Sequence, residues 1–158
     1  MTLYHGSNVE IQAIDLSKSR PFKDFGKAFY LSADKNQAFE MGQSKSALFG
    51  GTPVISIFEF DESIMSSSEL KVKVFEQYDK EWADFIFANR NKANKDFSHG
   101  YDIVYGPIAN DSVGNQVFRY KEGYISFDDF INNLKHKGGI TFQYAFCSEN
   151  AIAKLKKL

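Results

Sequence analysis

The fold of this chain is decided by the stretch DFGKAFYLS, residues 24–32. Its apolar residues alternate with small or polar ones, so residues 27–32 are predicted to form a strand. Successive side chains of a strand point to opposite faces, which places Tyr30 between two small residues, Ala28 and Ser32, on one face. A large polar side chain among small neighbours is typical of the wall of a cleft.

The segments on either side of this strand are also predictable. Asp34 followed three residues later by Gln37 indicates a helix that starts with a capping box, and Gly50 is placed to end it. On the N-terminal side, TLYHG at residues 2–6 predicts a short strand that stops at the glycine, and the polar residues 8–23 predict a surface loop with at most a short turn.

The remaining elements follow from hydrophobic periodicity. Residues 53–60, PVISIFEF, have two largely apolar faces and are predicted to form a central strand. The other predicted elements are strands over 70–75, 102–107 and 140–147, helices over 78–91 and 127–137, the second capped by Ser126 and ended by Gly138 and Gly139, and a short basic C-terminal helix capped by Ser148. The order lacks the regular alternation of βαβ units, so we expect an α+β fold in a single domain, residues 1–158.

Composition excludes several classes of protein. With 19 basic and 20 acidic residues, the net charge of -1 provides no global field for nucleic acid or a membrane surface. A single cysteine, Cys147, cannot form an internal disulfide, and the three histidines are too far apart in sequence to predict a metal site. The chain has no secretion signal and no apolar run long enough to span a bilayer, so we expect a cytoplasmic protein without a membrane partner.

Three polar residues on predicted strands are candidates for a site: His5, Tyr30 and Gln143. In the last strand Gln143 shares its face with the small residues Thr141, Ala145 and Cys147, much as Tyr30 does in its own strand. Each also has an ordinary structural explanation, because strand tyrosines usually pack in the core and lone histidines or glutamines usually bond water or backbone. The pattern alone leaves both interpretations open.

Five blocks of sequence, in order, resemble a known superfamily. They are YHGS at 4–7, DFGKAFYL at 24–31, the helix at 82–90, YDIVYGPIAND at 101–111, and Gln143 with Phe146 in the last strand. These blocks are similar to the ADP-ribosyltransferases of the diphtheria toxin and poly(ADP-ribose) polymerase clade. They are more similar still to a group of small bacterial domains of unknown function that carry YHGS, DFGKGFYL and YDIVxGPxAxD.

The resemblance implies a split β-sheet core with flanking helices and NAD as co-substrate, without a metal. It implies a catalytic triad of His5, Tyr30 and Gln143, in which His5 bonds a ribose hydroxyl and Tyr30 stacks on the nicotinamide ring. The backbone of Gly6 would clamp the carboxamide, with Ser7 beside it. Arg20 and Lys27 are the candidates for the pyrophosphate, although either can be a solvated surface charge.

The third position of the triad departs from the polymerase pattern, where a glutamate is usual. Gln143 keeps a hydrogen bond but supplies no charge or general base, so the resemblance implies transfer of a single ADP-ribose unit to a macromolecular acceptor. The small size and the resemblance suggest a toxin of a toxin–antitoxin or phage-defence pair, with an antitoxin as partner. A binding module without turnover and an NAD glycohydrolase remain alternatives.

Other conspicuous residues are assigned structural roles. Asp24 and Asp111 lie beside turn signals, where aspartate commonly bonds local backbone, so a structural role is at least as well supported for each as a catalytic one. Glu149 follows a helix cap and is a favourable N-terminal charge. Trp82 and its helical neighbours are expected to form a face packed into the core.

Overall fold

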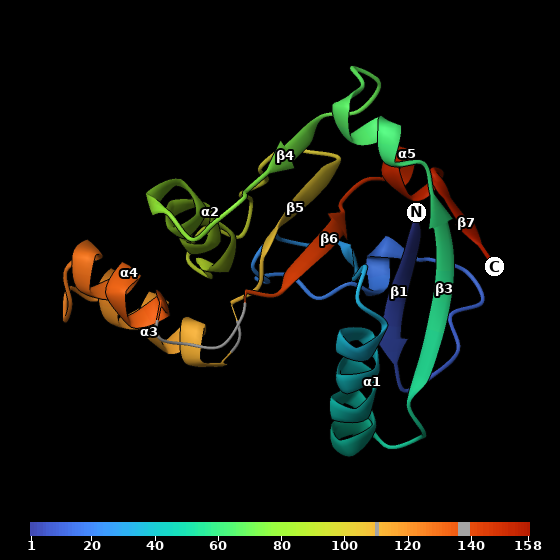
Figure 1. The fold of residues 1–158 in the computed structure, drawn as a ribbon, viewed down its shortest axis with the longest axis horizontal. Coiled ribbons are helices and arrows are strands. Elements are labelled where there is room, and N and C mark those ends of the chain that lie inside the picture. Colours follow the sequence, from blue (N-terminus) through green and yellow to red (C-terminus); the bar gives the residue numbers. More distant parts are fainter. Residues whose placement is uncertain (110, 136–139) are drawn as a thin grey trace.

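The computed structural model describes residues 1–109, 111–135 and 140–158, which form an α+β fold with two sheets (Figure 1). The first sheet has the order β1-β3-β7, and the second has the order β2-β6-β5-β4. The strands are β1 Thr2–Ser7, β2 Phe29–Leu31, β3 Val54–Phe60, β4 Val72–Val74, β5 Ile103–Pro107, β6 Phe142–Phe146 and β7 Leu155–Lys157. The helices are α1 Lys35–Phe49, α2 Lys80–Arg90, α3 Asp111–Lys121, α4 Phe127–Lys135 and α5 Glu149–Ile152, with 3₁₀ turns at Leu16–Lys18 and Glu62–Ser66.

Strand pairing is antiparallel except between β4 and β5. The predicted central strand, β3, lies in the middle of its sheet between β1 and β7. The strand predicted over 27–32 is shorter than expected, because the N–H and C=O of Ala28 are both bonded to the hydroxyl of Ser19 and leave the ladder. Because only β4 and β5 pair in parallel, the described residues contain no parallel doubly wound sheet.

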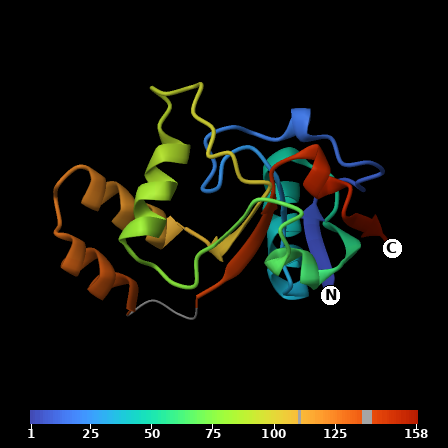
Figure 2. The same cartoon turned by 90° about the horizontal axis from the view of Figure 1, so that it is seen from above.

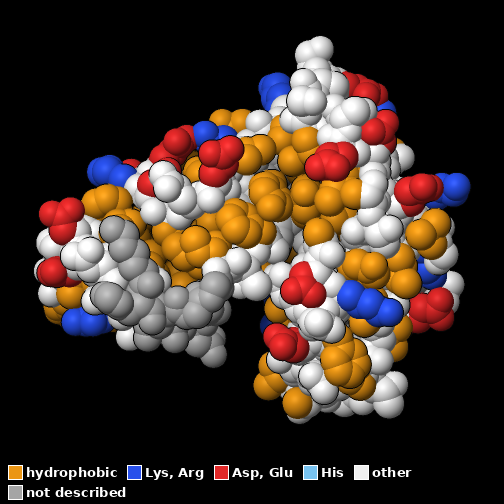
Figure 3. Space-filling model, viewed as in Figure 1, with side chains coloured by type: hydrophobic (Ala, Val, Ile, Leu, Met, Phe, Trp, Pro, Cys, Tyr) orange, Lys and Arg blue, Asp and Glu red, His pale blue; other side chains and the backbone are white. Residues whose placement is uncertain are grey.

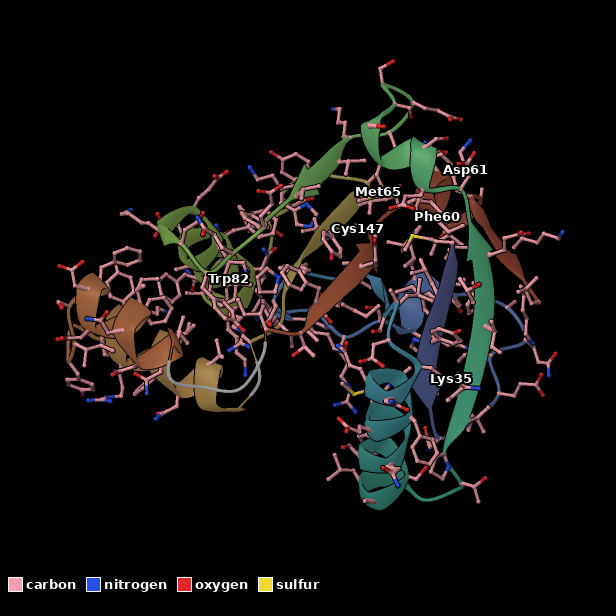
Figure 4. All side chains as sticks on the ribbon, viewed as in Figure 1. Lys35, Phe60, Asp61, Met65, Trp82 and Cys147 are labelled. Atoms are coloured by element: carbon pink, nitrogen blue, oxygen red, sulfur yellow. The ribbon has the colours of Figure 1, made fainter. Side chains whose placement is uncertain are left out.

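The predicted alternation of β2 and β6 is confirmed by two separate apolar cores. Phe29, Leu31, Tyr144 and Phe146 face a core between the two sheets, where Phe60 of β3 packs edge-on against the rings of β6 (Figure 4). The opposite face of β2 and β6 contributes Tyr30, Ala28 and Ala145 to a core that α2, α3 and α4 cover. Segment 24–32 thus divides one core from the other.

Helix α1 begins as the sequence predicts, with one difference. Asp34 Oδ1 accepts from the N–H groups of Asn36 and Gln37, and Gly50 follows the last helical residue. The side chain of Gln37 does not return to the backbone of Asp34. It accepts instead from the hydroxyl of Ser32, which also accepts from Asp34 N–H and ties the end of β2 to the start of the helix.

Helix α2 is amphipathic as predicted, with Asp79 as its cap and Trp82 and Ile86 fully buried. Trp82 also donates to the carbonyl of Pro107, which fixes α2 against the end of β5 (Figure 4). Helix α3 was not predicted, although Val113, Gln116 and Val117 are buried at helical spacing.

The C-terminal prediction is wrong in part. Ser148 does cap a helix, since its hydroxyl accepts from Ala151 N–H, but α5 is a single turn. The basic residues that follow form β7, because the edge of β3 offers Phe58 to Phe60 as partners for Leu155 to Lys157. The predicted end of α4 at Gly138 and Gly139 lies outside the described residues.

Seen from above, the loop between β1 and β2 lies on the same side of the molecule as α2 (Figure 2). Figure 1 shows α1 beside β1, and α3 and α4 at the far end of the second sheet. On the face drawn in Figure 3, hydrophobic side chains gather over β5 and β6. Tyr105 and Phe142 belong to the side of the second sheet that faces the first sheet, and both are half-buried.

Candidate functional site

The two sheets are joined at one pair of residues, Tyr4 of β1 and Ser32 at the end of β2. Tyr4 N–H donates to the Ser32 carbonyl (2.8 Å) and Ser32 N–H donates to the Tyr4 carbonyl (2.9 Å). Continuing this antiparallel register brings Gly6 opposite Tyr30, yet no ladder forms between them. We call this opening between β1 and β2, from Gly6 to Tyr30, the split.

The backbone of Gly6 faces the split. Tyr4 uses its N–H and C=O on β2, and backbone groups alternate in direction along a strand, so Gly6 also points away from β3. Among the described residues its N–H has no hydrogen-bond partner, and its carbonyl accepts from Lys45 Nζ at 3.0 Å. At this edge of β1, the unpartnered N–H group of Gly6 therefore lies beside a carbonyl that is bonded to Lys45.

Glycine is required at position 6 by the fold itself. A Cβ there would overlap the carbonyl oxygen of Ala38 and crowd the backbone of Gly42, because α1 packs directly on β1. The glycine is explained by this packing whether or not a ligand approaches. What carries information about a site is the direction of its N–H and C=O.

His5 crosses the split beside Gly6. Its Nδ1 donates to the carbonyl oxygen of Tyr30 (2.7 Å), and its ring stacks on Phe29 with centroids 4.3 Å apart. Burial, and to a lesser extent the charge of Lys45, lowers its pKa from 6.5 to about 4, so the ring is neutral at physiological pH. Nε2 is then an acceptor; it has no partner among the described residues and is not one of the fully buried atoms.

Tyr30 presents its ring and not its hydroxyl. The hydroxyl donates to the Gly26 carbonyl (2.6 Å) and accepts from Phe25 N–H (3.2 Å), and burial raises its pKa well above the usual value. Lys23 Nζ lies 5.1 Å from the ring centroid. The hydroxyl therefore anchors the preceding loop, and the aromatic face is already a site where a cation is bound.

Gln143 lies on the same face of the second sheet as Tyr30. Tyr30 pairs with Ala145, so Gln143 is a diagonal neighbour about 7–8 Å away between Cα atoms. The His5 ring stacks instead on Phe29, whose side chain leaves the opposite face of β2. The structure thus brings His5 and Tyr30 into contact through a backbone carbonyl, places Gln143 on the Tyr30 face, and leaves the three side chains unconnected by direct hydrogen bonds.

Three cations surround the split. Lys45 is half-buried and Lys23 is exposed to solvent on one side. Desolvation, followed by repulsion from basic neighbours, lowers the pKa of each, to about 8 for Lys45. Arg20 is one of those neighbours, and its guanidinium lies over the ring of Phe49, one turn beyond Lys45 on α1. Lys27 is exposed, and it is not one of the cations that act on His5. Ser7 is buried next to Gly6.

The loop before Tyr30 is held rigidly from the far side. Asp24 accepts from Arg90 Nε (2.6 Å) and from Ala109 N–H (3.0 Å), so it bonds groups far away in the sequence and not the local backbone as expected. His99 donates from Nε2 to the carbonyl of Phe25 (2.9 Å), while its Nδ1 accepts from Tyr101 N–H. The prediction for Asp111 concerns a side chain outside the described residues.

Two hollows in the described residues are lined by neither His5 nor Tyr30. One, of about 160 Å³, is lined by Gln37, Thr141, Phe142 and neighbouring residues on the reverse face of the second sheet. Another, of about 190 Å³, lies between the loop at residues 11–14 and the start of β7. At the split, Lys45 contacts the Gly6 carbonyl and Lys23 lies over the Tyr30 ring.

The match with a known family covers nearly the whole chain. Residues 1–157 match the family described as "Protein of unknown function (DUF3990)". The chain belongs to the DUF3990 family. No curated protein and no solved structure matches this DUF3990 chain.

Two searches of the described residues of this DUF3990 protein gave negative results. No group of three or more histidine, cysteine, aspartate or glutamate side chains is placed to hold a metal ion. No helix within the described ranges has the length and hydrophobicity required to cross a membrane.

Sequence reasoning missed two residues of this site, Lys23 and Lys45. Lys45 lies three positions after Gly42 on the face of α1 that packs on β1, and a lysine on a packed face is a detectable anomaly. Lys23 gave no such signal, because its position over Tyr30 depends on the path of the loop, in which Phe22 has a left-handed φ of 62°.

Proposed function

We propose that this protein is an NAD-dependent mono-ADP-ribosyltransferase that modifies a macromolecular acceptor. The observation that carries the proposal is the backbone of Gly6, which presents a free N–H and a carbonyl to the split opposite Tyr30. A carboxamide needs one donor and one acceptor side by side, and the sequence resemblance assigns this role to the same glycine. The ADP-ribosyltransferase form of the α+β fold is part of the proposal.

The neighbouring groups suit the rest of the dinucleotide. The ring of Tyr30 would stack on the cationic nicotinamide in place of Lys23, which supports the site because that face already binds a cation. The neutral His5 would accept a ribose hydroxyl at Nε2, since Nδ1–H is already committed to Tyr30. Arg20, whose guanidinium lies over Phe49, would meet the pyrophosphate, and the exposed Lys27 is the second candidate for this contact. Ser7 lies too deep to act except through its backbone.

In the proposed reaction the bond between the ribose C1′ and the nicotinamide nitrogen breaks, and the electron pair leaves with nicotinamide. The positively charged sugar is then captured by a nucleophile of the acceptor, which loses its proton. Gln143, on the Tyr30 face, would bond the ribose hydroxyl without contributing charge. An acceptor that is already nucleophilic fits this arrangement better than chain elongation does.

The amide at position 143 also favours a second candidate, a module that binds NAD or ADP-ribose without turnover. The two are separated by incubating the purified protein with NAD and cell extract and measuring free nicotinamide and label transferred to protein or nucleic acid. Nicotinamide release with transfer supports the transferase, and release without transfer indicates an NAD glycohydrolase. Binding of ADP-ribose with no release under any condition indicates the binding module.

The small size and the resemblance support a biological role as the toxin of a toxin–antitoxin or phage-defence pair, with an antitoxin protein as partner. Expression in bacteria should then arrest growth, and His5→Ala should relieve the arrest without reducing the amount of folded protein. Growth that is unaffected by the wild-type protein would contradict the toxin role while leaving the transferase chemistry intact.

A further inference from the structure

Lys45 holds the carbonyl that the proposed carboxamide needs. It reaches from the β1-facing side of α1 to Gly6 O at 3.0 Å, whereas the adjacent Gly6 N–H has no partner among the described residues. A nicotinamide that entered the split would find its donor partner available and its acceptor partner occupied. Because a carbonyl oxygen has two lone pairs, Lys45 competes for this acceptor without exhausting it, and we expect a tighter clamp when Lys45 moves away.

The surroundings of Lys45 oppose its positive charge. The charged and titratable groups around it are Lys23 and Arg20 from the loop before β2 and His5 from β1, which is neutral. None of them is a carboxylate, and Asp24, which acts on Lys23, is already bonded to Arg90 and Ala109. Among the described residues none of these three cations forms an ion pair, and such a cluster favours the arrival of a polyvalent anion.

Resting on the proposed function, we propose that Lys45 is a displaceable plug on the Gly6 carbonyl, and that the pyrophosphate of the dinucleotide draws it away. A phosphate oxygen is a stronger partner for an ammonium group than a neutral carbonyl is, and a lysine side chain has the freedom to swing between the two. Phosphate binding then frees the acceptor for the carboxamide. The site accordingly selects the whole dinucleotide over free nicotinamide.

The proposal predicts a coupling that is measurable without turnover. Binding of nicotinamide to the full chain is titrated by calorimetry at pH 7, with and without saturating ADP. We expect ADP to tighten nicotinamide binding roughly tenfold or more, because breaking a charge-assisted hydrogen bond no longer opposes it. Since coupling is reciprocal, nicotinamide should tighten ADP by the same factor.

Variants of Lys45 separate the plug from a simple electrostatic effect. Lys45→Met removes the plug, so nicotinamide should bind without ADP about as tightly as it binds the wild type with ADP. Lys45→Gln can still bond Gly6 but is not drawn by phosphate, so nicotinamide should bind weakly with or without ADP. Lys45→Arg should retain the coupling, and Lys35→Met, at an exposed lysine in the first turn of α1, should behave as wild type.

Two results would overturn the inference: equal nicotinamide affinity of the wild type with and without ADP, or unchanged coupling in a folded Lys45→Met variant. Folding of each variant is checked by thermal denaturation, and Lys45→Gln provides the answer if Lys45→Met does not fold. Nicotinamide release from NAD is measured in parallel. Release without coupling refutes the plug alone, whereas no release and no nicotinamide binding by any variant refutes the proposed function as well.

Discussion

The two histidines that bond the backbone of segment 24–32 have opposite surroundings. His99 uses both ring nitrogens, one on Phe25 O and one on Tyr101 N–H, and its ring lies against Phe85 and Tyr101. His5 uses one nitrogen, on Tyr30 O, and leaves the other without a partner among the described residues. Burial lowers the pKa of both histidines, so they differ in the number of ring nitrogens that are hydrogen-bonded and not in charge.

The same contrast extends to the neighbours of each histidine. Around His99, Asp24 is fully engaged by Arg90 and Ala109, and every group serves to fix the loop. Around His5, the N–H group of Gly6 has no partner among the described residues, and other cations repel the charge of Lys45. A region whose hydrogen-bonding groups are all paired serves to hold the structure. A region with unpaired donors, acceptors and charges is a candidate for binding a ligand.

The largest expected effect comes from breaking the scaffold at Asp24. Asp24→Ala leaves Arg90 and Ala109 N–H without their partner, so the free energy of unfolding should fall by about 3 kcal/mol. The melting temperature, followed by circular dichroism, should fall by roughly 10 °C. Asp84→Ala, which removes an exposed ion pair with Lys80, is the control and should cost less than about 1 kcal/mol. A loss at Asp24 no greater than the control's would show that the loop is fixed by other contacts.

Exchanging the two histidines for alanine should give opposite results. His5→Ala should lower kcat/KM for NAD cleavage about a hundredfold, roughly 2.7 kcal/mol in activation free energy, with little change in stability. His99→Ala should lower the free energy of unfolding by about 2 kcal/mol and leave the activity of the folded fraction nearly intact. Equal activity losses in both variants, normalised to folded protein, would remove the distinction between the site and the scaffold.

Variants of Gln143 test whether this residue, on the same sheet face as Tyr30, belongs to the site. Gln143→Ala should lower NAD cleavage about tenfold, close to 1.4 kcal/mol, because it removes one hydrogen bond to the ribose. Gln143→Glu should keep or raise the rate, since a carboxylate stabilises the developing positive charge. Rates of nicotinamide release that are identical in all three proteins would remove Gln143 from the site.

The smallest expected effect is a pH dependence of stability. The pKa of His5 is lowered from 6.5 to about 4 in the folded state, so the unfolded chain binds the proton more readily. The contribution is fully present above pH 6.5 and is lost as the pH falls from 6.5 towards 4. The full shift would correspond to about 3 kcal/mol, and the partial exposure of the ring reduces the expected loss to the order of 1 kcal/mol. Urea denaturation of the wild type and His5→Asn at several pH values isolates it. A stability difference between the two proteins that stays constant over this range would contradict the burial of a neutral His5.

The sequence was sufficient to predict the α+β class and most elements, because their signals are local. The alternation in residues 28–32 and 142–146 placed Tyr30 and Gln143 on one face, and the capping residues Asp34 and Ser148 fixed two helix starts. Helix α3 also had a local signal, the spacing of Val113, Gln116 and Val117, which was overlooked.

Other features depend on contacts between distant segments. The basic C-terminus forms β7 only because β3 provides an edge, and no propensity of its own predicts this. The cations of the split come from the loop before β2 and from α1, and only the packing of α1 on β1 brings Lys45 to Gly6. The opposite sides taken by His5 and Tyr30 likewise follow from the way the two sheets meet at Tyr4 and Ser32.

The central claim, that NAD is cleaved at the split with nicotinamide on Tyr30, is tested most directly by nicotinamide release from NAD by three proteins. The wild type should release nicotinamide in the presence of cell extract. Tyr30→Ala, without the ring, should be at least a hundredfold slower, whereas Tyr30→Phe, which keeps the ring and loses only the loop bonds, should remain within about tenfold. No release by the wild type, or undiminished release by Tyr30→Ala, would contradict the claim.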